Sequence, residues 1–143
     1  GVDVTVCATL EADHRWLMKF AELTPGIFIL PNFLSLSDFP RFILYIIESR
    51  SIDTVLVTGS TLGYQLLPYL RTAAPDTAFI DLCHTEEMHW LNGGHPRFAL
   101  GYQDALDINV VSTRHLCEWM IQRGANPDNI RVMYTGIKSN PVS

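Results

Sequence analysis

Short apolar segments alternate along the chain with longer segments in which apolar residues recur at helical spacing. This alternation is typical of a parallel sheet joined by crossover helices, because buried strands are short and apolar whereas the covering helices are amphipathic. The pattern predicts strands at residues 2–9, 27–31, 54–58, 77–83, 108–111 and 131–134, and helices at residues 14–23, 38–49, 61–73, 97–107 and 113–123. The expected fold class is α/β, a Rossmann-like parallel sheet with helices on both faces.

Local signals place several ends of these elements. Ser37 is expected to cap the second helix, and Pro40 fits its first turn, where no backbone N–H is needed. Gly124 stands where a helix requires a left-handed residue in order to end, and residues 126–129 are expected to form a turn. Pro68 lies inside the third predicted helix and removes a backbone hydrogen bond, so a kink or a split is expected there.

Composition narrows the class of protein. The chain has 48% hydrophobic residues, and its 10 Lys and Arg against 15 Asp and Glu give a net charge of −5, which argues against a nucleic-acid partner. Cys7, Cys83 and Cys117 lie at unrelated spacings in apolar segments, which is typical of reduced core cysteines. No apolar run approaches the roughly 20 residues of a membrane span, and no signal pattern opens the chain. A soluble cytoplasmic protein is expected, and peripheral association with a membrane stays open.

The end of the third predicted strand is the first candidate site. Ligands of open parallel sheets bind beyond the carboxyl ends of the strands, where the next helix begins. The residues there are Gly59, Ser60 and Thr61, whose backbone N–H groups and hydroxyls suit a phosphate or a sugar. A tight turn at Gly59 followed by a Ser60 helix cap explains the same residues, so both interpretations stay open.

The end of the fourth predicted strand carries a denser set of polar residues. The chain passes there from apolar residues directly into His84, Thr85, Glu86 and Glu87. His84 is expected at the ligand-facing edge, where an imidazole can donate a hydrogen bond to a hydroxyl or phosphoryl oxygen. The alternative is an ordinary polar residue at a strand end.

A metal site built on the histidines of this region is not expected. His84 and His89 are five residues apart, which departs from the i, i+4 spacing that pairs ligands on a helix. His95 lies beyond the flexible pair Gly93 and Gly94, and zinc sites follow much more regular spacings.

The last part of the chain resembles a known family. This part begins with a predicted strand that ends at Ser112, followed by an amphipathic helix that ends at Gly124. A turn and a second apolar strand come next, and then Gly136 with Ile137. This order resembles the end of the N-terminal domain of glycosyltransferase family 4, the group 1 glycosyltransferases, which runs there into an Asn-Gly-Ile-Asp-like motif. The chain departs from that motif, with Thr135 in place of Asn and Lys138 in place of Asp.

Three further segments match the same family in order. Residues 1–6, Gly-Val-Asp-Val-Thr-Val, resemble the family's second strand, and residues 52–57 resemble a later strand. The sequence Cys83-His84-Thr85 resembles its strand-end His-Thr or His-Asp pair. The resemblance covers nearly the whole chain, and the block from Ser112 to Gly136 is its most specific part.

The resemblance implies one half of a GT-B enzyme, in which two Rossmann-like domains face each other across a cleft. Such enzymes transfer a sugar from a nucleotide-diphosphate donor with retention at the anomeric carbon, and the family requires no metal or other cofactor. Residues 1–137 would be part of the N-terminal, acceptor-side domain, and residues 138–143 the start of the interdomain linker. The resemblance implies a catalytic contact from His84 to the transferred sugar or the donor phosphates. Acceptor contacts would come from Thr85, Ser60 and Thr61, and the hinge would lie at Thr135 and Gly136.

The same resemblance sets expectations about partners and activity. The donor nucleotide-sugar would bind mainly to a C-terminal domain outside this sequence, and the acceptor would be a saccharide or a lipid-linked saccharide. Residues 1–143 alone are expected to be inactive. The family's first strand would lie between residues 2–9 and 54–58, so these two strands are expected to pair directly, or else to form a homodimer through the sheet.

Two other classes of function stay open. A flavodoxin-like binding or signalling domain would carry an acidic cluster after its first strand, where this chain has only Glu11 and Asp13. A sugar-nucleotide epimerase shares the two-domain architecture. A dinucleotide-binding dehydrogenase is not expected, because no Gly-x-Gly-x-x-Gly follows any strand.

Overall fold

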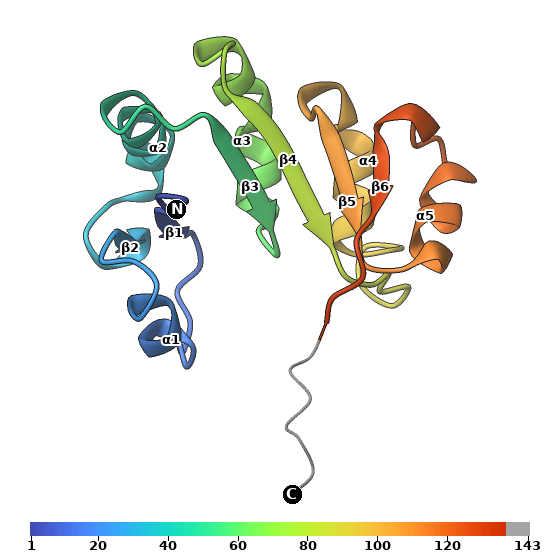
Figure 1. Cartoon of the computed structure of the whole chain (residues 1–143), viewed down its shortest axis with the longest axis horizontal. Coiled ribbons are helices and arrows are strands. Elements are labelled where there is room, and N and C mark those ends of the chain that lie inside the picture. The colour runs from blue at the N-terminus through green and yellow to red at the C-terminus, as the bar shows by residue number, and fades with distance from the viewer. Residues whose placement is uncertain (137–143) are drawn as a thin grey trace, which may run out of the picture.

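In the computed structural model, residues 1–136 are described and form two parallel sheets with connecting helices (Figure 1). The elements in chain order are β1 (Val6–Ala8), α1 (Leu17–Ala21), β2 (Ile27–Ile29), α2 (Phe39–Ser49), β3 (Thr54–Thr58), α3 (Thr61–Ala73), β4 (Ala78–Cys83), α4 (His95–Gly101), β5 (Ile108–Val111), α5 (Arg114–Ile121) and β6 (Ile130–Val132). Short 3-10 turns lie at Leu30–Asn32, Leu36–Asp38, Gln103–Ala105 and Pro127–Asn129. None of the helices in this part of the chain is long and apolar enough to cross a bilayer.

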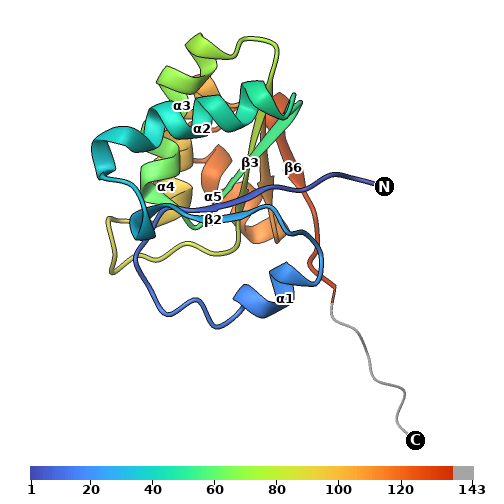
Figure 2. The ribbon, with the colours of Figure 1, turned by 90° about the vertical axis from the view of Figure 1, so that its left-hand side faces the viewer.

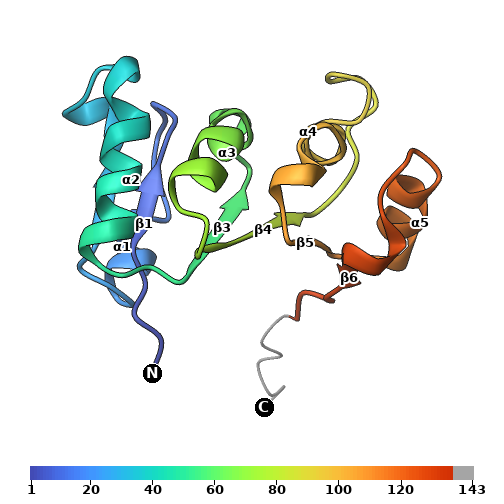
Figure 3. The same ribbon diagram turned by 90° about the horizontal axis from the view of Figure 1, so that it is seen from above.

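The strands form a two-stranded sheet, β1-β2, and a four-stranded sheet in the order β3-β4-β5-β6, and every pairing is parallel. Helices α2 to α5 form one layer on one face of the strands, whereas α1 lies on the opposite side of β1 and β2 (Figure 3). The α/β, Rossmann-like fold class expected from the sequence is therefore confirmed.

The core lies between the four-stranded sheet and the layer of helices α2 to α5. Strand residues at alternate positions, such as Phe79 and Val111, point into it and meet Leu67, Leu116 and Met120 from the helices, all at 0% exposure. Burial of such apolar side chains stabilises the fold by about 1.5–3 kcal/mol each. This core fixes the strands whose carboxyl ends carry the candidate site.

A buried polar cluster interrupts the apolar core. The Asp81 carboxylate is fully buried and accepts hydrogen bonds from Tyr64 Oη at 2.8 Å and Asn109 Nδ2 at 3.1 Å. Cys83 Sγ lies 3.4 Å from the same carboxylate, and the backbone N–H of Val110 also donates to it. Burial raises the pKa of Asp81, and these hydrogen bonds oppose the shift. No disulfide links the cysteines within residues 1–136, where all three are free.

Helix ends follow from capping and backbone chemistry. Ser60 Oγ accepts the N–H of Gly63 at 2.9 Å at the start of α3, and Thr113 Oγ1 accepts the N–H of Leu116 at 3.1 Å at the start of α5. Each such cap satisfies a donor that the helix leaves free. Gly124 has φ +104, as expected for a residue that ends a helix.

Several predicted boundaries are wrong. Helix 14–23 is reduced to Leu17–Ala21, which buries none of its residues and so gains little from packing. Helix 97–107 begins earlier and ends at Gly101, because Pro96 fits the first turn and glycine is a poor helix former. Pro68 does not split α3, and the cap of α2 is Asp38 instead of Ser37.

The predicted strands are also shorter at four places. Strand 2–9 is reduced to β1, and strand 27–31 ends at Ile29, because Pro31 enters a 3-10 turn. Strand 77–83 begins at Ala78, and strand 131–134 moves to Ile130–Val132. A residue belongs to a strand only where its backbone pairs with a neighbouring strand, so the unpaired ends of these segments lie outside the strands.

Direct pairing of residues 2–9 with residues 54–58 is not observed, so that prediction is wrong. β1 pairs only with β2, and β3 pairs only with β4. No strand of the described residues lies between them, and the two sheets stand side by side as separate ladders (Figure 1). Their carboxyl ends approach closely enough for Thr9 Oγ1 to hydrogen bond Ser60 Oγ at 2.6 Å.

Candidate functional site

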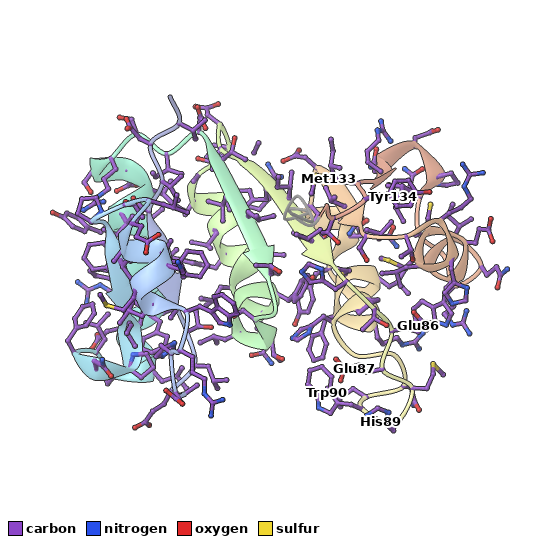
Figure 4. The ribbon with its side chains drawn as sticks, turned by 60° about the horizontal axis from the view of Figure 1, so that its bottom comes forward. Glu86, Glu87, His89, Trp90, Met133 and Tyr134 are labelled. Carbon is purple, nitrogen blue, oxygen red and sulfur yellow. The ribbon has the colours of Figure 1, made fainter. Side chains whose placement is uncertain are left out.

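The carboxyl ends of β3, β4 and β5 lie along one edge of the four-stranded sheet. Parallel pairing aligns Thr58 with Leu82 and Cys83 with Val111, so the residues that follow these strands are neighbours. The loop after β4 spreads across this edge, and Figure 4 shows Glu86, Glu87, His89 and Trp90 on it. In open parallel sheets this edge is where ligands bind. We define the candidate site as residues 59–61, 84–87 and 112–115.

The segment after β3 provides hydroxyl groups and a helix N-terminus. Gly59 adopts φ +59, and an added Cβ would meet nothing within 4 Å, so its backbone stands open to solvent. Ser60 Oγ accepts the Gly63 N–H as the cap of α3 and also lies 2.6 Å from Thr9 Oγ1. Thr61 begins α3, a helix of 13 residues whose first-turn N–H groups favour negative charge. The capping interpretation of Ser60 is therefore confirmed.

His84 and Thr85 directly follow β4, and both are exposed. The backbone around His84 is held firmly: Ser112 Oγ donates to the His84 carbonyl at 2.6 Å, and the Ser112 N–H donates to the Cys83 carbonyl at 3.1 Å. The position of the imidazole is thus fixed at its base while the ring faces solvent. Thr85 makes only a long contact, with Oγ1 3.4 Å from the Glu86 carbonyl.

An acid–imidazole pair bridges two strand ends. His115 Nε2 lies 2.7 Å from Glu86 Oε1. The Glu86 side chain is 20% exposed, whereas the His115 side chain is 73% exposed. A hydrogen bond from its own backbone, then the His115 contact, hold the pKa of Glu86 below its usual value against the effect of burial. Glu86 is therefore an ionised acceptor beside His84.

The loop after β4 owes its shape to consecutive left-handed residues. Leu91 and Asn92 have φ of 51 and 54, and Gly93 and Gly94 have φ of 138 and 65. A Cβ on Gly93 would lie 2.6 Å from the ring of Trp119, so only glycine lets the loop pack on α5. Positive φ at a leucine costs free energy and is concentrated at functional loops.

The indole of Trp90 is anchored on the far side of this loop. Its ring packs edge-on against His95 at a centroid distance of 5.0 Å and lies stacked on Phe98 at 6.5 Å. Glu87 accepts the N–H groups of Trp90 and Gly93, which closes the turn. This packing orders the loop, and it makes no use of the exposed His84 side chain.

Chemically, the site offers hydroxyl, imidazole and carboxylate groups around a helix N-terminus. Groups of these kinds can donate or accept hydrogen bonds to a polar ligand. Within residues 1–136 no group of three His, Cys, Asp or Glu side chains converges as metal ligands do. His89 is exposed on the loop and His95 packs against Trp90.

The predicted hinge residues follow the last strand of the sheet, β6. Thr135 and Gly136 are exposed and follow β6 without regular structure, beyond Met133 and Tyr134, which Figure 4 labels. The predicted linker at 138–143 lies outside the described residues. Because β6 is parallel to β5 and Val132 pairs with Val111, the chain leaves β6 at the same carboxyl edge of the sheet as the site, on the far side of β5 from β4.

Sequence reasoning placed Ser60, Thr61, His84 and Thr85 on one edge but missed the pair between Glu86 and His115. The available signal was the position of His115, which follows the cap of a helix that starts beside His84. Comparison of the chain with family models, with curated proteins and with solved structures finds no match. The assignment of function therefore depends on the site and on the sequence motifs.

Proposed function

We propose that this chain forms the acceptor side of the cleft in a retaining glycosyltransferase that uses a nucleotide-diphosphate sugar. The observation that carries the proposal is the exposed His84 on a fixed backbone at the carboxyl edge of the sheet, beside Thr85 and Glu86. The sequence resemblance supports the proposal as well, because His84 occupies the same place in the order of segments as the family's strand-end histidine.

In this proposal His84 donates a hydrogen bond to a hydroxyl of the transferred sugar or to a donor phosphate oxygen. Hydrogen bonds to charge that develops on the departing diphosphate lower the barrier, because they are stronger in the transition state than in the ground state. Thr61 and Thr85 bind hydroxyls of the acceptor. Ser60 acts through position only, since its hydroxyl already caps α3 and contacts Thr9.

The pair of Glu86 and His115 orients the acceptor in the same proposal. A carboxylate with a lowered pKa accepts hydrogen bonds from sugar hydroxyls at neutral pH. His115 fixes the direction of that carboxylate from the neighbouring helix α5. The two residues are positioning groups and take no part in bond breaking.

The test is the release of nucleoside diphosphate from a panel of uridine-, guanosine- and adenosine-diphosphate sugars by the full-length protein. His84→Ala is expected to lower turnover by about 10²-fold or more with the fold intact, because a transition-state contact is lost. The matched control is His89→Ala, which removes an exposed imidazole from the same loop. It is expected to change turnover less than about threefold.

Three outcomes would count against the proposal. One is that no sugar nucleotide in the panel is turned over or bound by the full-length protein. Another is that both alanine variants lose activity equally and recover it with added zinc, which would indicate a metal site. The third is conversion of the sugar without transfer, which would favour the epimerase.

A further inference from the structure

A cavity of about 220 Å³ lies between the small sheet β1-β2 and helix α1. Helix α1 runs on the opposite side of these strands from α2 (Figure 2). The sheet contributes two cross-strand pairs to the wall of the cavity, Val6 with Ile27 and Ala8 with Ile29. The helix contributes Leu17 and Phe20 from the other side. Most of the wall is therefore apolar.

One polar atom of this wall is buried without a hydrogen bond. His14 lies in the loop between β1 and α1 and lines the cavity. Its Nε2 is inaccessible to solvent and has no hydrogen-bond partner within residues 1–136. Leaving a buried polar atom unpaired costs free energy, and native proteins satisfy nearly all such atoms. We therefore expect the partner of His14 Nε2 to come from a molecule in the cavity.

The neighbours of His14 in the loop are engaged elsewhere. Asp13 and Arg15 also line the cavity, but they pair with each other at 2.8 Å, and their side chains are 75% and 82% exposed. Trp16 is 71% exposed. A water molecule in a cavity needs about two to four polar partners, and the side chains that β1, β2 and α1 contribute are apolar. A ligand with an apolar body and one hydrogen-bonding group suits this wall better than water does.

The size and the lining of the cavity indicate a single ring. An apolar cavity of about 150 Å³ is enough to hold benzene. A volume of about 220 Å³ thus accommodates one ring with a small substituent. Trp16 and Phe20 lie in the wall, and aromatic side chains pack favourably against a ring in edge-to-face or offset geometry. A hydroxyl both donates and accepts, so it pairs with an imidazole nitrogen in either tautomer.

We propose that this cavity is a binding site for a small aryl alcohol. The ring lies between the sheet β1-β2 and α1, and the hydroxyl forms a hydrogen bond with His14 Nε2. Binding satisfies the buried nitrogen and gives α1, which buries none of its residues, a packing partner. The cavity is lined by residues other than those of the candidate site at 59–61, 84–87 and 112–115. The inference does not depend on the proposed sugar chemistry.

The test compares phenol with toluene, which has nearly the same shape but lacks the hydroxyl, by calorimetric titration of the whole protein. We expect a Kd of about 0.3 mM for phenol and about fivefold weaker binding of toluene, because one hydrogen bond is lost. His14→Phe keeps a ring and removes Nε2, so this variant is expected to bind toluene at least as tightly as phenol. The matched control is His89→Phe, at an exposed imidazole on the loop after β4, which is expected to keep the fivefold preference.

Two further measurements locate the bound ring. Ala8→Leu fills part of the cavity and is expected to weaken the binding of both ligands by at least about tenfold. Methyl NMR of the unsubstituted protein gives the same information without a change in the core. Phenol is expected to shift the methyl resonances of Val6, Leu17 and Ile29 and to leave those of Val111 in the main core unchanged.

Several results would overturn the proposal. One is that phenol does not bind with a Kd below about 10 mM, and another is an unchanged preference for phenol in His14→Phe. Binding that survives Ala8→Leu, or methyl shifts confined to the main core, would place the ring elsewhere. Without ligand, His14→Phe is expected not to lower the urea midpoint, because Nε2 has no hydrogen bond to lose. A lower midpoint would show that the protein itself satisfies this nitrogen.

Discussion

The substitution Asp81→Asn is expected to lower the free energy of unfolding at low pH and to raise it at high pH, because the fold buries this carboxyl group without a cation beside it. The Asp81 side chain is 0% exposed, and the groups within hydrogen-bond distance are Tyr64, Cys83, Asn109 and the Val110 N–H. Burial raises the pKa of this carboxyl above its value in the unfolded chain. Its contribution to stability is therefore fully present below the unfolded pKa and is lost as pH rises towards the folded pKa.

The magnitude follows from linkage and from the hydrogen bonds that an amide can keep. Asparagine retains one acceptor oxygen for Asn109 and Val110, and its NH₂ group can donate to Tyr64 Oη. Tyr64 then needs another acceptor, and Cys83 Sγ lies 3.5 Å away. We expect a loss of about 1 kcal/mol below pH 4, the net value of one hydrogen bond. Each pH unit between the unfolded and folded pKa values returns about 1.4 kcal/mol to the variant relative to the parent.

The assay is urea unfolding between pH 3.5 and 8, followed by the fluorescence of the three tryptophans, of which Trp119 is 8% exposed. The control is Asp3→Asn, a change at an exposed position near the N-terminus, which is expected to leave the pH dependence unaltered. A free-energy difference between Asp81→Asn and the parent that stays constant across this range would refute the reasoning. It would mean that the four donors hold Asp81 ionised at no greater cost than water does.

Two further substitutions test the loop and the helix beside the site. Gly93→Ala is expected to lower stability by about 2 kcal/mol or more, because its Cβ would lie 2.6 Å from Trp119 at φ +138; Gly101→Ala, with nothing within 4 Å of its Cβ, is the control, and equal denaturation midpoints would contradict the expectation. Thr113→Ala is expected to cost about 1 kcal/mol through loss of the α5 cap, whereas Thr113→Ser is expected to retain it; denaturation midpoints that rank these two variants the other way would contradict the capping role.

The sequence predicted those elements of the fold that pack against the main core. Strands 54–58 and 108–111 and helix 61–73 match β3, β5 and α3 at both ends, because burial and capping act at the same residues. Helix 14–23 was overestimated, since its periodic apolar residues have no surface to pack against in this structure. Direct pairing of the two sheets was also predicted wrongly. Periodicity identifies a strand but carries no information about whether its neighbour is present.

The candidate site divides in the same manner. The rule that ligands bind beyond strand ends placed Ser60 and His84 on one edge of the sheet. The observed parallel register, with Thr58 opposite Leu82, brings these two strand ends side by side. The contact between Glu86 and His115 joins two loops that are far apart in the sequence, and neither residue carries a local signal for it. The loop after β4 also has positive φ at Leu91 and Asn92, which their residue types do not predict. Glycine at 93 and 94 signals such a turn, but not the side of the sheet to which the loop folds.

The hydrogen bonds of Ser112 to the Cys83 and His84 carbonyls extend the sheet by one residue past the end of β4. The backbone of His84 is therefore held by β5, whereas the backbone from Thr85 onwards is held by the contacts of the loop. In the proposed transferase, the placement of the imidazole would then depend on the register of the sheet, and the placement of Glu86 on its contact with His115.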